Sequence, residues 1–240
     1  MSEVKREADS WEETEEEHAV RLAEVRSKKP LKVWQGGVNV SYDIHLARVG
    51  RFVFKPKSGE QAPKSSITVG TQYLREAAAF RIDRALGFNL VPLTVVRSVD
   101  GEVGSAQAWI DIEGWVYGYR LADQGRFAVL DYILGNIDRH IFNWRTQADT
   151  RPSAIDNGLC LPCSTSEPLR SRWIHLLRDK ELPEEVMREV QSLSSARATA
   201  ILEGLSIEEV AIDGFKSRLA EVKTEGRITL AAWGADLRRS

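Results

Sequence analysis

The densest cluster of polar side chains lies in the segment LDYILGNIDRHIFNW, residues 130–144. It contains Asp138 and Asn143, and a second acid, Asp156, follows Trp144 by twelve residues. Aspartate and asparagine oxygens, brought together at a helix end and a short strand, are the ligands that hard divalent ions such as Mg²⁺ prefer. Such ions usually keep substrate phosphates among their ligands, whereas softer metals would require more histidine or cysteine. The cluster therefore indicates phosphate chemistry that uses Mg²⁺.

Phosphoryl transfer needs a group that orients the nucleophile, ligands for Mg²⁺ and a lysine on the phosphates. We assign the first role to Asp138, which would accept or orient the attacking hydroxyl, and the metal to Asn143 and Asp156. Lys55 stands at the end of a predicted strand, so the fold would hold its amine within reach of a phosphate. Glu76, at the start of a predicted helix, would pair with Lys55.

A turn that covers the phosphates is the remaining part of such a site, and Gly36-Gly37-Val-Asn-Val-Ser41 is the candidate. Glycine lets the backbone approach closely, so amides of this turn would lie against phosphate oxygens. Along the chain the order is turn, lysine, glutamate, then Asp, Asn and Asp, which is the order of parts in protein kinases. The loop itself reads D-R-H, where those kinases have H-R-D.

The elements that must carry these residues are predicted from hydrophobic periodicity. Strands are predicted over residues 38–46, 51–55, 90–97 and 103–112. Between the second and third strands, apolar residues recur at helical spacing over 74–86, and Gly87 is expected to end that helix. The first half of the chain is therefore rich in strands and contains one inserted helix.

The second half of the chain is predicted to be mainly helical. A helical face over 127–137 leads into the polar cluster. Further helices are predicted over 183–194, 196–204 and 206–223. Ser206 and Glu209 have the spacing of a capping box at the start of the last helix. A strand-rich half followed by a helical half predicts an α+β fold of two lobes, an N-lobe at 30–112 and a C-lobe at 113–240.

Residues 1–29 differ from the rest, with nine acidic and six basic side chains. They are good helix formers, with no glycine and no internal proline, so the segment is predicted to be a helical arm. Its apolar stripe is thin. A solvated helix or frayed tail is one interpretation, and an arm that docks a partner is the other.

The composition excludes several other classes of protein. The 240 residues include 33 basic and 35 acidic side chains, a formal charge of -2, whereas a nucleic-acid-binding domain is usually clearly basic. No apolar run approaches the roughly 20 residues that cross a bilayer, and the acidic N-terminus fits no secretory or mitochondrial leader. The cysteines, Cys160 and Cys163, fit a reducing cytoplasm as unpaired thiols. We therefore expect a cytoplasmic protein with no nucleic-acid partner and no transmembrane segment.

Several segments together match a known family in the family's order. They are VFKPK at 53–57, REAAAFRIDRALG at 75–87, LVPLTVV at 90–96, LDYILGNIDRHIFNW at 130–144 and AIDNGLCLP at 154–162. In these segments the sequence resembles the phosphatidylinositol 3-/4-kinase-like superfamily, and most of all the type II phosphatidylinositol 4-kinases and their bacterial relatives. The resemblance implies a bilobal, protein-kinase-like fold that binds ATP between the lobes.

The resemblance also implies roles for individual residues. It makes Lys55 the phosphate-binding lysine, Asp138 the catalytic aspartate of a DRHxxN motif, and Asn143 and Asp156 the metal ligands. His140 matches a loop histidine for which a role near the transferring phosphate is proposed. The segment at the lobe junction would meet the adenine, and its candidate residues are Gln107, Trp109 and Ile110.

The acceptor of the phosphate is left open by these residues. Type II lipid kinases carry a cysteine-rich palmitoylated stretch between the lobes that this sequence lacks, and no basic cluster indicates an anionic membrane surface. HipA-like protein kinases share much of the motif scheme. A phosphoinositide-like lipid, a protein serine or threonine and a small metabolite therefore remain as acceptors. A pseudokinase that only binds nucleotide is the non-enzyme alternative, and transfer of AMP is also compatible with the motifs.

Overall fold

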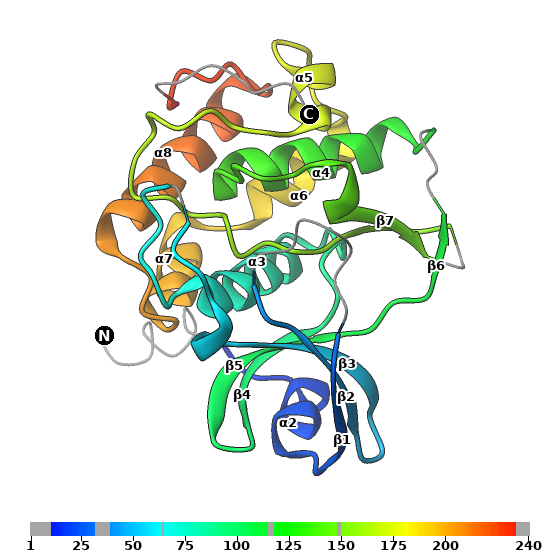
Figure 1. Cartoon of the computed structure of the whole chain (residues 1–240). Helices are drawn as coiled ribbons and strands as arrows, with labels where there is room; N and C mark the ends of the chain where they lie inside the picture. Colours follow the sequence, from blue (N-terminus) through cyan, green and yellow to red (C-terminus); the bar gives the residue numbers. More distant parts are fainter. Residues whose placement is uncertain (1–10, 32–38, 64, 115–117, 148–149, 234–240) are drawn as a thin grey trace, which may run out of the picture.

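The computed structural model describes residues 11–31, 39–63, 65–114, 118–147 and 150–233. These residues form a strand-rich N-terminal part and a mainly helical C-terminal part, which confirms the expected α+β fold (Figure 1). Helix α3 (Gln72–Leu86) lies between the sheet and the C-terminal helices. The lobe boundaries predicted above remain proposals.

Among the described residues, a five-stranded antiparallel sheet dominates the N-terminal part. Its strands are β1 (Val25–Pro30), β2 (Tyr42–Leu46), β3 (Gly50–Pro56), β4 (Thr94–Val99) and β5 (Glu102–Ala108), in the spatial order β1-β2-β3-β5-β4. Phe52 and Phe54 of β3 are buried on one face, so Lys55 lies on the other face, because successive side chains of a strand alternate. In the register of β3 against β5, Lys55 is opposite Ser105.

The N-terminal arm differs from its prediction over its second half. Helix α2 (Glu15–Leu22) is followed by strand β1, which pairs with β2, so the helical prediction is wrong for residues 25–29. Backbone pairing across the sheet outweighs the helix propensity of this segment. In its described part, the arm packs through one side of α2: Val20 is buried and its carbonyl oxygen accepts a hydrogen bond from Arg97, while most other α2 side chains are exposed. Trp11 lies edge-on against Phe80 of α3.

Helix α3 ends as predicted, and its last turns decide where the next strand begins. Gly87 adopts a left-handed conformation with φ 77° and caps the helix. The carboxylate of Asp83, fully buried, accepts hydrogen bonds from the amides of Leu90 and Val91 at 3.1 and 3.0 Å. Because those amides bond to a side chain, strand β4 begins at Thr94 rather than at residue 90.

Replacing Asp83 by alanine is expected to lower the free energy of unfolding by about 2–4 kcal/mol, because two buried amides lose their acceptor. Urea denaturation of the wild type, Asp83→Ala and Asp83→Asn provides the measurement. The asparagine variant keeps one acceptor oxygen and should lie between the other two. Equal stability of all three proteins would show that water replaces the carboxylate at no cost.

The C-terminal part is built on helix α4 (Leu121–Leu134), which precedes the polar cluster. The other helices are α5 (Arg172–Leu177), α6 (Glu184–Ser192), α7 (Ser195–Glu203) and α8 (Glu209–Glu225). Helix α4 stops at Gly135, which has φ 61°, so Ile137 lies beyond it. The capping-box prediction for the last helix is wrong: Glu208 is its N-cap residue, and Ser206 has φ 54° in the preceding turn.

A second, smaller sheet supports the polar cluster. It consists of β6 (Ile112–Gly114), β7 (Trp144–Gln147) and β8 (Pro152–Ala154). Short 3₁₀ helices, η1 (Lys57–Gly59) and η2 (Ile141–Asn143), follow β3 and precede β7. Strand β5 ends at Ala108, so the expected strand over 103–112 is divided between β5 and β6. Trp144 packs against Trp173 of α5 at 5.3 Å between ring centroids, which anchors β7 to the helices.

Within the described part of the chain, no helix is both long and apolar enough to cross a membrane.

Candidate active site

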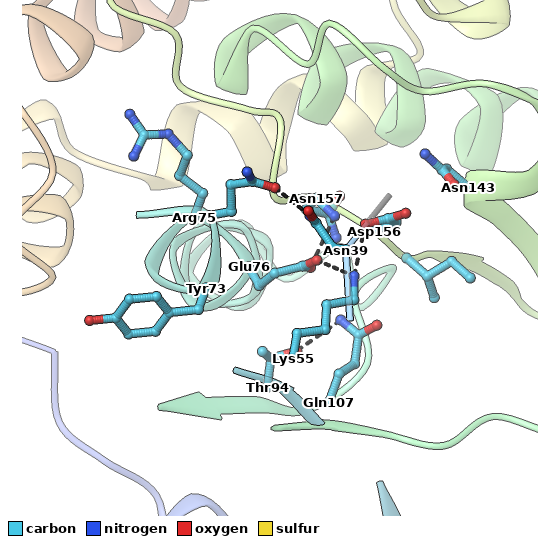
Figure 2. Close-up of polar contacts among 12 residues, drawn as sticks. Asn39, Lys55, Tyr73, Arg75, Glu76, Thr94, Gln107, Asn143, Asp156 and Asn157 are labelled. Carbon is cyan, nitrogen blue, oxygen red and sulfur yellow. Dashed lines mark hydrogen bonds and ion pairs between the residues drawn. The ribbon is translucent and has the colours of Figure 1, made fainter. Parts of the chain in front are cut away.

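Lys55 lies between two carboxylates at the centre of the site (Figure 2). Its Nζ donates to Glu76 Oε1 of α3 at 2.5 Å and to Asp156 Oδ1 at 2.8 Å. Strand β5 holds this lysine closely, because a Cβ on Gly104 would lie 2.3 Å from the Lys55 carbonyl oxygen. Only glycine fits there, a constraint that sequence reasoning missed. Residues from β3, α3 and the segment after β8 thus meet at one amine.

The electrostatics of this triad keep Lys55 and Asp156 charged. Burial alone would lower the pKa of Lys55, but the charges of Asp156 and Glu76 outweigh it and raise the pKa. The Lys55 charge in turn lowers the pKa of Asp156. Glu76 is almost completely buried and also accepts a hydrogen bond from the Asn157 amide at 2.9 Å, so its position is fixed on two sides. The lysine therefore remains a cation, held between two carboxylates.

Asp138 stands in the loop after α4 with both of its carboxylate oxygens facing cationic or ionisable groups. Arg170 Nη1 donates to Oδ1 at 3.2 Å, and His140 Nε2 lies 3.7 Å from Oδ2. The Asp138 amide donates to Asn136 Oδ1 at 2.9 Å. About a third of the Asp138 side chain is exposed, so an acceptor molecule can reach it. Arg170 was not among the residues expected from the sequence.

The surroundings of Asp138 suit a group that receives a proton during transfer. Burial raises the pKa of Asp138, and the charge of Asp156 adds to this, while His140 and Arg170 oppose it. Burial lowers the pKa of His140, which favours the neutral ring. Because His140 Nδ1 accepts from the Phe142 amide at 3.1 Å, the proton of the neutral ring is on Nε2, toward Asp138.

The fully buried Arg139 joins the Asp138 loop to the Asp156 segment. Its Nη1 donates to the carbonyl oxygens of Asn143 at 2.7 Å and Ile155 at 2.6 Å, and its Nη2 donates to Asn157 Oδ1. Its charge is balanced by buried Asp131, whose Oδ1 is 2.9 Å from Nε. Sequence reasoning assigned no role to this arginine, although it is the middle residue of the D-R-H motif. Its neighbours in space could not be found from spacing.

Asn143 and Asp156 have the donor chemistry that Mg²⁺ requires. The Asn143 amide nitrogen donates to the Asp138 carbonyl oxygen at 2.8 Å, which leaves Oδ1 as the oxygen for a cation. The two residues are brought together because the Ile155 amide donates to the Asn143 carbonyl oxygen at 3.0 Å. Asp156 has φ 57°, a left-handed conformation that aspartate and asparagine tolerate better than other side chains. An amide oxygen and a carboxylate fit a hard divalent cation.

The other residues that were expected to contact the nucleotide differ from one another in their surroundings. Gln107 is on the same face of the sheet as Lys55 and donates to Thr94 Oγ1 at 2.9 Å (Figure 2). The Trp109 ring stacks on the Arg51 guanidinium, and its backbone amide donates to the Arg51 carbonyl oxygen, so neither is directed at a nucleotide. Ile110 follows in the connection to β6 and is partly exposed.

The expected phosphate turn is only partly within the described structure. Gly36 and Gly37 lie outside the described residues. Ser41 is buried just before β2, and its carbonyl oxygen accepts from the Leu31 amide at 2.9 Å. Asn39 contacts α3, since its Nδ2 donates to Gln72 Oε1 at 2.7 Å. The end of the turn is therefore tied to the helix that carries Glu76.

No protein-family model matches the chain. Protein Rv2133c of Mycobacterium tuberculosis is 25% identical over 197 residues, which cover 64% of this chain and 68% of that protein.

Solved structures of kinases share the fold. The Golgi casein kinase with Mn and ADP bound superposes with a TM-score of 0.60 at 18% identity, covering 87% of this chain and 74% of that one. The Helicobacter pylori proinflammatory kinase CtkA gives a TM-score of 0.50 at 11% identity, with 86% and 93% coverage. A hydra Fam20 structure with sugar gives 0.51 at 15% identity, with 87% and 86% coverage. The chain therefore has a bilobal α+β fold like that of these kinases.

Proposed function

We propose that this protein is an ATP- and Mg²⁺-dependent phosphotransferase that moves the γ-phosphate of ATP to a hydroxyl group. The observation that carries the proposal is the convergence of Lys55, Glu76 and Asp156 from three separate elements, beside a loop that holds Asp138 and Asn143. The kinase-like fold supports it, as does the nucleotide and divalent metal named with the Golgi casein kinase structure. A pure binding module would not need Asp138 in addition to the ion-pair triad.

Each residue has one task in the reaction. Lys55 binds phosphate oxygens of ATP, and Glu76 keeps its amine in place. Asn143 and Asp156 hold Mg²⁺, which supplies neutralisation of the charge on the phosphates. Asp138 orients the acceptor hydroxyl and receives its proton. As the hydroxyl oxygen forms a bond to the γ-phosphorus, the bond from that phosphorus to the β-phosphate oxygen breaks and ADP leaves.

Three classes of acceptor fit the proposal. The motif resemblance favours a phosphoinositide-like lipid, while the name of one structural neighbour, the Golgi casein kinase, favours a protein hydroxyl. A small metabolite is a third possibility that the same chemistry allows. The reaction at phosphorus is identical in all three cases, so the acceptor has to be found by experiment.

Labelled ATP distinguishes these possibilities in one experiment. The protein is incubated with Mg²⁺ and ATP labelled at the γ- or the α-phosphate, together with cell extract that is then separated into lipid, protein and small-molecule fractions. We expect label from γ-labelled ATP in one fraction and none from α-labelled ATP. Transfer of the α label would show that the protein transfers AMP rather than the γ-phosphate. No transfer from either, with binding of Mg²⁺ and ATP retained, would make the protein a nucleotide-binding pseudokinase.

A further inference from the structure

Arg75 is the residue before Glu76 on α3, and its side chain is completely buried between the two parts of the molecule. Its Nε donates to the carbonyl oxygen of Cys160 at 2.9 Å, and its Nη2 donates to that of Leu161 at 3.2 Å. Nη1 donates to Thr71 Oγ1 within the same helix turn. The phosphotransfer proposed above assigns no task to this arginine.

The carboxylate paired with Arg75 comes from the far end of the chain. Glu208, the residue that precedes α8, accepts from Arg75 Nη2 with Oε2 at 2.8 Å. A guanidinium that is removed from water is strongly destabilising unless a nearby carboxylate compensates its charge. The other acceptors of Arg75 are neutral oxygens, so Glu208 is the partner that makes this burial tolerable.

The geometry of α3 links this ion pair to the active site. Successive residues of an α-helix are about 100° apart around its axis, so Arg75 and Glu76 project from adjoining faces. Glu76 meets Lys55 and the Asn157 amide on one face while Arg75 meets residues 160, 161 and 208 on the next. Any rotation of α3 that brought Arg75 to water would carry Glu76 away from Lys55.

We propose that Glu208 is a positioning residue for the active site: through Arg75 it holds α3 in the orientation that keeps Glu76 on Lys55. The inference rests on the proposed phosphotransfer only for its effect on turnover. Its structural part, the coupling between the start of α8 and the orientation of α3, stands independently. The site is thus held together by a contact made far along the chain from any residue that touches phosphate.

The test uses the full chain with Glu208→Ala, Glu208→Gln and, as a matched control, Glu209→Ala. Glu209 is the exposed neighbour in the first turn of the same helix, so its loss controls for removal of an acidic side chain at the start of α8. Hydrogen exchange of peptides from α3 is measured by mass spectrometry, and initial rates of transfer are measured over a range of ATP concentrations. Melting temperature is recorded for every variant.

We expect Glu208→Ala to exchange at least about tenfold faster in α3, and to lose at least about tenfold in kcat/KM, while Glu209→Ala matches the wild type in both. Glu208→Gln keeps an acceptor oxygen and should fall between them. If Glu208→Ala unfolds, the proposal is tested by comparing Glu208→Gln with Glu209→Ala in the same two measurements. Wild-type exchange in α3 and wild-type turnover in the Glu208 variants would overturn the proposal.

Failure of the proposed function would look different. A wild-type protein that transfers no label to any acceptor refutes the phosphotransfer, yet faster exchange of α3 in Glu208→Ala would still establish the coupling. An active wild type with Glu208→Ala equal to Glu209→Ala in both measurements refutes the coupling and leaves the phosphotransfer in place.

Discussion

Replacing Asp156 by asparagine is expected to reduce phosphotransfer by about a thousandfold or more in kcat/KM. The carboxylate is one of the two side chains that we assign to Mg²⁺, and loss of a metal that neutralises phosphate charge is a loss of several kcal/mol of transition-state stabilisation. At about 1.4 kcal/mol for each factor of ten, roughly 4 kcal/mol corresponds to that reduction. Initial rates at varied Mg²⁺ and ATP, with circular dichroism for the fold, measure it.

Asparagine is the right substitution because the backbone of Asp156 has φ 57°. Asparagine tolerates this left-handed conformation, whereas alanine would add strain that could be mistaken for a loss of metal binding. Lys55 keeps Glu76 as its partner in the variant, so the fold should persist. Asp213→Asn, which changes an exposed aspartate on α8 that pairs with Lys216 one helical turn away, is the matched control and should retain wild-type rates. Full turnover of Asp156→Asn would refute the metal assignment.

Replacing Asp138 by asparagine is expected to lower kcat by about 10²–10⁴-fold and to change the KM for ATP little, because general base catalysis contributes an effect of that size. The backbone of Asp138, which binds Asn136 and Asn143 through its amide and carbonyl groups, is unaffected by the change. The loop should therefore keep its shape. Steady-state kinetics with saturating acceptor measure the split between kcat and KM.

The two aspartates should also differ in a measurement without turnover. ATP with Mg²⁺ is expected to raise the melting temperature of Asp138→Asn as much as that of the wild type, and that of Asp156→Asn much less, since only the second change removes a metal ligand. Equal stabilisation of both variants, or a kcat of Asp138→Asn within a factor of three of the wild type, would contradict the division of roles.

The near-neutral charge of the chain bears on the acceptor. A formal charge of -2 in 240 residues offers little general attraction to an anionic membrane, where each surface lysine or arginine contributes roughly 1 kcal/mol. Binding to anionic vesicles can be tested by co-sedimentation before any lipid is tried as a substrate. A lipid acceptor would then have to be recognised within the site rather than through a charged surface.

Local patterns in the sequence were sufficient for much of the N-terminal fold. The periodicity that ends at Gly87 predicted α3, and the short segment at 51–55 that stops before Pro56 predicted β3, because both signals lie in neighbouring residues. The motif order also named the residues that the structure brings together around Lys55 and Asp138. Lys55 lies near the end of β3, and Asp138 lies shortly after α4. The preceding element therefore limits where each of these side chains can lie.

Local sequence patterns did not predict the contacts between distant segments. The helix prediction for residues 1–29 included the residues of β1, but this segment forms a strand because it pairs with β2. The sequence analysis assigned no role to Arg139 or Arg75, yet both are fully buried and each joins distant segments around the site. Burying a charge costs free energy, so a buried arginine requires partners that stay in place. Whether an arginine is buried depends on every element packed around it, which local sequence patterns do not show. Residue types and motif order were enough to name the candidate groups for the chemistry, whereas the contacts that hold those groups in place depend on how distant segments pack.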